Sequence, residues 1–121
     1  MCTLDGPLLN DATLAEVRIL GDDFLEEIVG AFVADAPGRI TRLHAAFGIR
    51  AADAIRREAH GLKGGALSVG AARMADICQA IEQHAADGQL DDAASLENAI
   101  DPVFDETCLA LETLRCGRSS A

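Results

Sequence analysis

Apolar residues recur at steps of three and four along most of this chain, and this spacing restricts the possible folds more than any other feature of the sequence. It runs through residues 25–47, 55–69, 74–85 and 96–114. Such steps match the 3.6-residue turn of an α-helix, so each segment predicts an amphipathic helix with one face in a core. The expected core positions are Leu25, Ile28, Val29, Phe32, Ala36, Ile40, Leu43 and Phe47, then Ile55, Ala59, Leu62, Ala66 and Val69, then Met74, Ile77, Cys78, Ile81 and Ala85, and finally Leu96, Ile100, Val103, Phe104, Thr107, Leu111 and Leu114.

Turn and capping residues separate these segments from one another. A further short helix, capped by Asn10 or Asp11, is expected to run to about Leu20. Pro37 and Pro102 lie inside two of the segments and should bend the helices there. The caps expected for the later helices are Asp22 or Asp23, Asp53, and Asp91 or Asp92.

The short connections force neighbouring helices to run antiparallel. The sequence therefore predicts an all-α fold: an antiparallel up-down-up-down four-helix bundle with a short additional N-terminal helix. At 121 residues the chain fits one domain. We expect residues 11–116 to form this domain, preceded by a flexible lead-in of residues 1–10 and followed by a frayed tail of residues 117–121.

The balance of charge argues against several classes of partner. Asp and Glu number 20 against 10 Lys and Arg, which gives a formal net charge of −10. Nucleic acids and anionic membranes bind cationic surfaces, so neither is expected as a partner. No run approaches the ~18 apolar residues of a membrane span, and no basic and then apolar leader opens the chain, so we expect a cytoplasmic protein, and a monomer. The four cysteines form no CxxC pair and are expected to be reduced.

His60 lies where the sequence breaks a local rule. Gly61, Gly64 and Gly65 follow it inside the expected helix, although each interior glycine costs about 1 kcal/mol relative to alanine. Sequences often break propensity rules at functional sites. On a helical wheel His60 lies about 140° from the apolar stripe, on the same face as Lys63. We therefore expect the glycines to keep the imidazole accessible, and His60 to be functional.

Three polar residues of the following helix can reach the His60 ring. His60 lies ten residues before Gly70, and Glu82 lies twelve residues after it, so both stand about 15 to 18 Å from the turn. Gln79 and Gln83 compete with Glu82 on this geometry. A carboxylate that accepts the Nδ1 proton would leave the Nε2 lone pair pointing outward and make it more basic.

Residues 60–64, with the sequence His-Gly-Leu-Lys-Gly, are followed at fixed distances by Gly70 and Glu82. This pattern resembles the histidine-containing phosphotransfer (HPt) domains of bacterial phosphorelays, and the resemblance extends in weaker form over residues 14–115. One position departs from the family. Many members carry a hydroxyl or a larger side chain directly after the histidine, where this chain has Gly61.

The resemblance implies a function and a role for each site residue. His60 would accept a phosphoryl group from an aspartate of a receiver domain and pass it to another response regulator. Glu82 would orient the ring, and Lys63 would lie near the phosphate. The implied partners are receiver domains or a hybrid histidine kinase. The receiver would supply Mg²⁺, so this chain would need no cofactor or metal of its own.

A docked receiver would cover the surface around His60. The glycine face should admit it, apolar residues of the first two helices should flank it, and a basic neighbourhood should attract its acidic site. The residues expected in this surface are Gly61, Gly64, Gly65, Leu67, Arg56, Leu20 and Phe24.

Other functional classes fit less well. A di-metal bundle needs Glu-x-x-His pairs, and neither residues 58–60 nor residues 82–84 have that spacing. A kinase needs a Gly-rich nucleotide loop, which the sequence lacks, so we expect a phosphocarrier and not an enzyme. The alternative is a non-catalytic helical adaptor that binds receiver domains or kinases without phosphotransfer. His44 and His84 lack neighbouring glycines and are expected to be ordinary surface residues.

Overall fold

The computed structural model describes residues 6–119, with side chains described as far as residue 114, and all the regular structure in this range is helical. The expected all-α class is confirmed, including the short N-terminal helix. The helices are α1 (Asp11–Ile19), α2 (Asp22–Gly48), α3 (Ala52–Ser68), α4 (Ala72–Ala86) and α5 (Leu90–Ser119).

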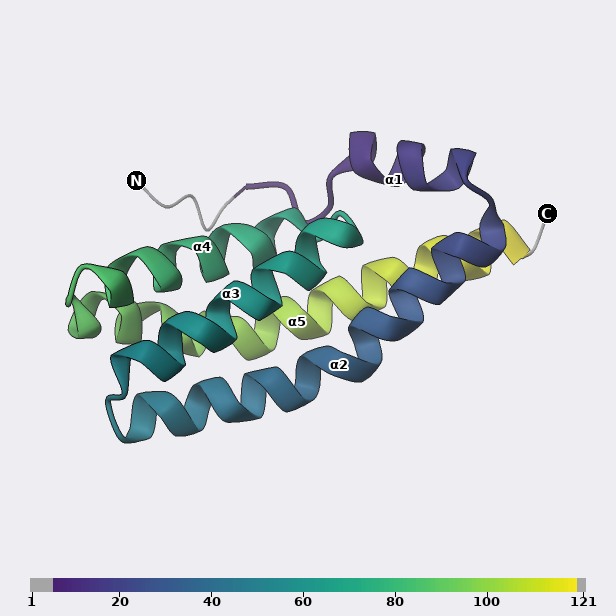
Figure 1. Ribbon diagram of the computed structural model, residues 1–121. Helices are drawn as coiled ribbons and strands as arrows, with labels where there is room; N and C mark the ends of the chain where they lie inside the picture. The colour runs from purple at the N-terminus through teal and green to yellow at the C-terminus, as the bar shows by residue number, and fades with distance from the viewer. Residues whose placement is uncertain (1–5, 120–121) are drawn as a thin grey trace.

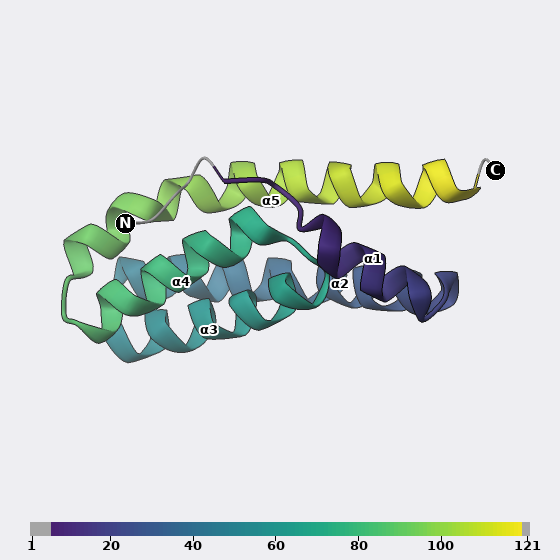
Figure 2. The ribbon, with the colours of Figure 1, turned by 90° about the horizontal axis from the view of Figure 1, so that it is seen from above.

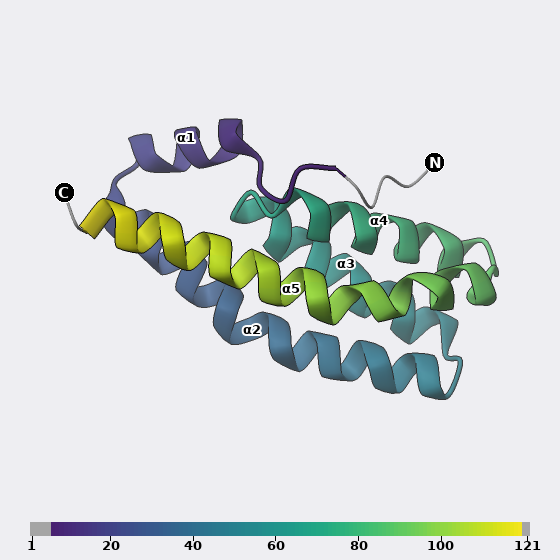
Figure 3. The same cartoon turned by 180° about the vertical axis from the view of Figure 1, so that it is seen from behind.

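Helices α2 to α5 form the bundle (Figure 1). α3 packs between α2 and α4, α4 packs against α5, and α5 returns to α2. Seen from the front and from behind (Figures 1 and 3), the first part of α2 and the last part of α5 extend together beyond α3 and α4. α1 packs on α2, and Figure 2 shows it beside this extension, past the end of α3. The bundle therefore has a four-helix end and a thinner end.

Most positions that the apolar spacing selects lie in the core. The four predicted positions within α3, Val69 just after it and all five of α4 are buried, and so are most of those on α2 and α5. Ile28, Phe104 and Leu114 are only partly buried and pack against the edge of the core. Leu20, the expected end of the first helix, is exposed, because α1 ends at Ile19 and the chain turns away there.

The expected helix caps are correct at α1 and wrong elsewhere. Asn10 Oδ1 accepts a hydrogen bond of 3.1 Å from Thr13 N, as a side-chain cap should. α2 follows Gly21 and α3 follows Ala51, and neither has a side-chain cap. The aspartates expected as caps of α2, α3 and α5 all lie within the first turn. A carboxylate in the first turn still stabilises the helix, because it interacts favourably with the positive end of the helix dipole. For this reason such residues resemble caps in a sequence.

Both prolines lie inside continuous helices, as expected. α2 continues through Pro37 and α5 through Pro102, and Figure 1 shows α2 bending in its middle. α5 also continues to Ser119, beyond the expected boundary at residue 116. Residues 120–121 of the expected tail lie outside the described residues.

The segment before α1 is attached to the turn between α3 and α4. Asn10 N donates to Gly70 O at 2.7 Å, and Arg73 donates to the carbonyls of Leu8 and Gly6 at 3.3 and 2.9 Å. Gly70 has a φ of +69°, and a Cβ there would lie 3.1 Å from Asn10 O, so the turn requires glycine. Residues 1–5 of the expected lead-in lie outside the described residues.

None of the helices between residues 6 and 119 combines the length and the apolar character needed to cross a bilayer.

Candidate functional site

His60 projects from the outer face of α3. Its neighbours Ala59 and Leu62 point into the core, and the His60 side chain is 68% exposed. Its Nδ1 lies 3.0 Å from Glu82 Oε2 on α4. Since an ionised carboxylate can only accept, this contact assigns the proton to Nδ1. Nε2 then keeps its lone pair, and it has no hydrogen-bond partner among the described residues.

Glu82 lies between His60 and Lys63. Burial alone would raise the pKa of the Glu82 carboxyl, but the hydrogen bonds and charges of Lys63 and His60 outweigh burial and lower this pKa. Oε1 is buried and lies 2.8 Å from Lys63 Nζ, although it accepts no well-aligned hydrogen bond within the described part of the chain. The Lys63 ammonium is therefore the charge that compensates this oxygen.

The structure separates the three candidates for the His60 ring. Glu82 contacts the ring, whereas Gln79 Oε1 accepts a hydrogen bond of 2.8 Å from Lys63 Nζ. Gln83 contacts neither residue and donates to Asp87 at 3.2 Å. Gln79 is therefore a neighbour of the lysine and not of the histidine. Its spacing did not reveal this, because Lys63 and His60 stand one turn apart on the same face.

Lys63 is held at the surface of the bundle. Its side chain is 21% exposed, and its ammonium group is shared between Glu82 and Gln79. An ammonium has three N–H donors; Gln79 accepts one of them, and Glu82 lies beside the group as its counter-ion. The buried thiol beneath the site is unreactive, because burial and the Glu82 charge raise the pKa of Cys78 to about 12.

The three glycines after His60 do not share one purpose. A Cβ at Gly64 would meet nothing within 4 Å, so this position is open to solvent beside the ring. At Gly65 a Cβ would lie 3.3 Å from the Phe32 ring, which packs on Phe104 with ring centroids 5.7 Å apart. At Gly61 a Cβ would overlap the guanidinium of Arg39. Of the three glycines expected to keep His60 accessible, only Gly64 faces open space, while Gly61 and Gly65 face side chains of α2.

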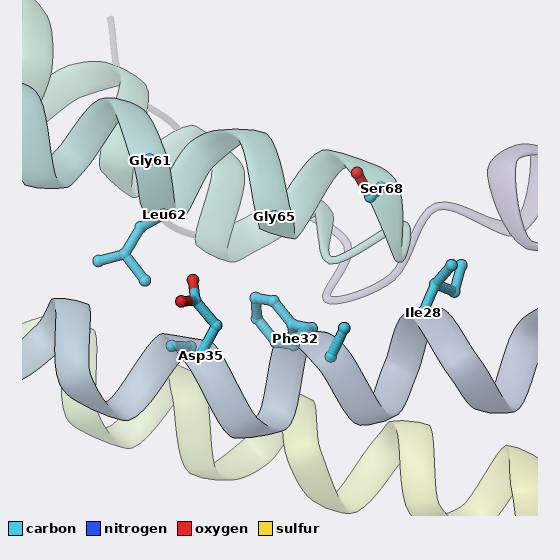
Figure 4. Close-up of a pocket in the computed structure, with 9 residues that line it drawn as sticks. Ile28, Phe32, Asp35, Gly61, Leu62, Gly65 and Ser68 are labelled. Carbon is cyan, nitrogen blue, oxygen red and sulfur yellow. The ribbon is translucent and has the colours of Figure 1, made fainter.

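A groove of about 320 Å³ lies between α2 and α3, beside the His60 turn (Figure 4). Figure 4 shows Phe32 beneath Gly65, with Asp35 at the Gly61 end and Ser68 at the other. The groove is mostly apolar. Its wall is formed by Ile28, Ala31, Phe32, Ala36 and Leu62 together with the bare backbone of the two glycines.

The remaining residues of the expected docking surface are spread along the bundle. Arg56 borders an open hollow that also contains His60 and Glu82, and Leu67 is exposed near the end of α3. Leu20 and Phe24 are exposed as well. However, Phe24 lies eleven residues before Asp35, so it stands about 16 Å along the helix axis from the Asp35 end of the groove. These two apolar residues mark the far end of the surface.

A cluster of charged side chains between α2 and α3 was not predicted from the sequence. Arg39 Nε donates to Asp35 Oδ2 at 2.8 Å, and its Nη1 donates to Glu58 Oε1 at 3.5 Å. Glu58 Oε2 accepts from Arg42 Nε at 3.1 Å. The spacing of Asp35 and Arg39 could have suggested their pairing, since residues four apart are neighbours on a helix. No pattern in the neighbouring sequence indicated that Glu58, on another helix, also binds Arg39.

His44 is not an ordinary surface residue, contrary to expectation. Its Nδ1 lies 2.6 Å from Glu97 Oε2 and its Nε2 lies 3.0 Å from Asp101 Oδ2, both on α5. The hydrogen bond to Glu97, followed by the effects of Asp101, raises the pKa of His44 although partial burial opposes this. His84 has a single neutral partner, Gln89 Oε1, at 3.0 Å. Among the described residues, no group of three or more His, Cys, Asp or Glu side chains is arranged to hold a metal ion.

Comparison with known proteins identifies the family to which this helical bundle is similar. The family model described as "Hpt domain" matches residues 27–115. The crystal structure of histidine-containing phosphotransfer protein B (HptB) from Pseudomonas aeruginosa PAO1 is similar, with a TM-score of 0.84 and 31% sequence identity. The match covers 92% of this chain and 96% of that one. No curated protein sequence matches this chain.

Proposed function

The chain belongs to the Hpt domain family, and on that premise we propose that it is a phosphorelay intermediate with His60 as the phosphoryl acceptor. His60 receives the group from the aspartate of one receiver domain and passes it to another response regulator. The observation that carries the proposal is the difference between the two ring nitrogens. Nδ1 is held by Glu82, while Nε2 faces solvent without a partner among the described residues.

In the transfer this chain supplies the nucleophile, and the receiver supplies the phosphoryl group. The Nε2 lone pair attacks the phosphorus of the receiver's aspartyl phosphate, in line with the bond to the aspartate oxygen. The N–P bond forms as the P–O bond breaks, and the aspartate leaves with the electron pair. Nδ1 keeps its proton throughout, so the phosphorylated ring is cationic and Glu82 balances its charge. The second receiver reverses these steps on its own aspartate.

Lys63 and Glu82 have different roles beside the His60 ring. Glu82 fixes the tautomer and the ring orientation through Nδ1. Lys63 is already fixed beside this carboxylate, and an N–H that Gln79 does not accept is available for a phosphoryl oxygen. Neither residue bonds to phosphorus: Glu82 positions the ring, and Lys63 stabilises the negative charge of the phosphoryl group. Mg²⁺, which the family resemblance assigns to the receiver, would neutralise the phosphoryl oxygens from the partner's side.

The test is phosphoryl transfer from receiver domains. The protein is incubated with phosphorylated receivers, separated, and examined for phosphate that is labile in acid and stable in base, as expected of phosphohistidine. His60→Gln should take up no label. His84→Gln is the matched control, because it removes a histidine with one neutral partner, and it should be labelled like the wild type. A wild-type protein that binds receivers but is never labelled would instead be the helical adaptor.

A further inference from the structure

Arg39 reaches from α2 to the backbone of α3 at the residue directly after His60. A Cβ built on Gly61 would lie 2.7 Å from Arg39 Cζ and 3.1 Å from its Nε, so the guanidinium occupies the space of a side chain at position 61. Real Cβ atoms essentially never come within 3.0 Å of another heavy atom. Gly61 is therefore required for this placement of Arg39, and any other residue would displace the guanidinium.

Two carboxylates hold Arg39 in this position. Asp35, one turn earlier on α2, accepts from Nε at 2.8 Å, and Glu58 of α3 accepts from Nη1 at 3.5 Å. Glu58 is mostly buried and is fixed from its other side by Arg42. The guanidinium thus lies between the two helices and is tethered to both.

Arg39 still has donors to offer. A guanidinium carries five N–H groups, and the bonds to Asp35 and Glu58 use two of them. The others have no hydrogen-bond partner among the described residues, and the side chain is 32% exposed. A pre-oriented planar fork of this kind suits a carboxylate, which it can bind through two parallel hydrogen bonds.

We propose that Arg39 is a specificity-determining contact for the docked receiver domain, and that its guanidinium over Gly61 binds a carboxylate on the receiver's docking face. This inference rests on the proposed phosphotransfer at His60. On the His60 side of α3, Arg56 and Lys63 are paired with Asp53 and Glu82, while Arg57 lines the same hollow as His60 and adds a positive charge that favours an acidic partner group. Gly61 thus serves receiver recognition through Arg39.

The competing interpretation is that Arg39 only braces α2 against α3. A brace would change stability and leave receiver binding as it is. The two roles are separated by the KM for a phosphorylated receiver, the maximal transfer rate, and the salt dependence of KM, measured beside thermal unfolding of each variant.

The experiment uses a phosphorylated receiver domain that labels the wild-type protein, and the variants Arg39→Met and Gly61→Ala. Each should raise KM about tenfold with little change in maximal rate, as expected for a lost charge-assisted contact made on docking. The double variant should be no worse than either single one, since both changes remove the same guanidinium contact. The difference from wild type should shrink as salt is raised.

Matched controls isolate the contact at Gly61. Arg50→Met removes an exposed arginine just after α2 that pairs with Asp91 of α5, and Gly30→Ala adds a methyl in α2 where a Cβ would meet nothing within 4 Å. Both should keep the wild-type KM. Arg39→Lys keeps the charge but loses the fork, so its KM should be intermediate, and it decides the matter if Arg39→Met folds poorly.

The outcomes separate this inference from the function on which it rests. If no receiver labels the wild type, both the docking role of Arg39 and phosphotransfer at His60 are wrong. If the wild type is labelled but Arg39→Met and Arg39→Lys keep its KM, or if the effects of Arg39→Met and Gly61→Ala simply add, the docking role of Arg39 is wrong and phosphotransfer at His60 stands. A KM change in Arg39→Met that is independent of salt would likewise exclude a carboxylate partner.

Discussion

His60 and His44 both lie beside carboxylates, yet the protein holds them in opposite ways. His60 has one carboxylate at Nδ1, and its side chain is 68% exposed. Both ring nitrogens of His44 are hydrogen-bonded to carboxylates, Nδ1 to Glu97 and Nε2 to Asp101, and its side chain is 34% exposed. With both nitrogens engaged, a histidine has no lone pair to offer and acts as a cation between helices. A neighbouring carboxylate prepares a nucleophile only if the other nitrogen is left free.

The largest expected effect comes from removing each ring in turn. His60→Gln should abolish phosphoryl transfer, whereas His44→Gln should retain the wild-type rate, because the α2–α5 contact lies outside the transfer site. Single-turnover transfer from a phosphorylated receiver measures both. Transfer that fails in a folded His44→Gln protein would show that the two histidines are not separate in function.

The partner of His60 can be changed without touching the ring. Glu82→Ala removes the acceptor of the Nδ1 proton, and the loss of a hydrogen bond worth about 1.5 kcal/mol should slow transfer about tenfold. Glu82→Gln keeps an oxygen acceptor and should transfer at a nearly normal rate. NMR of the ring nitrogens reports the tautomer in each protein. An unchanged tautomer in Glu82→Ala would mean that Glu82 does not orient the ring.

The open side of His60 can be closed at Gly64. Gly64→Gln should slow transfer several-fold, because it adds a side chain beside the ring where a Cβ would now meet nothing within 4 Å. The change should also raise helix propensity by about half a kcal/mol. The melting temperature should therefore rise while the transfer rate falls. A variant that is more stable and equally fast would contradict the steric account.

The smallest expected effect is a pH dependence of stability from His44. Its pKa is raised in the folded protein, mainly by the hydrogen bond to Glu97. Its contribution is therefore fully present below the unfolded pKa of about 6.5 and is lost as pH rises through the folded pKa. Between about pH 6 and pH 9 the free energy of unfolding should fall more in the wild type than in His44→Gln. Urea unfolding at the two pH values measures this, and equal slopes would exclude the mechanism.

Much of the fold followed from the sequence because its causes are local. The spacing of Ile55, Ala59 and Leu62 alone places them on one helical face, and that face is buried. The same applies to the cap at Asn10. The height of Glu82 opposite His60 followed from counting residues on either side of Gly70, since two antiparallel helices share one rise per residue. Thus the core, the helix order and the outward position of His60 could be predicted.

Only the tertiary structure decided how side chains from different helices meet. The rotation of each helix in the bundle and the reach of long side chains place Gln79 on Lys63, His44 between two carboxylates, and Arg39 on the bare backbone of Gly61. Residue spacing did not reveal these contacts, because each depends on how a long or polar side chain of one helix lies against another helix. The sequence by itself determined which residues face the core and that a histidine faces outward. Packing between α2 and α3 decided that an arginine lies over Gly61, the residue after this histidine.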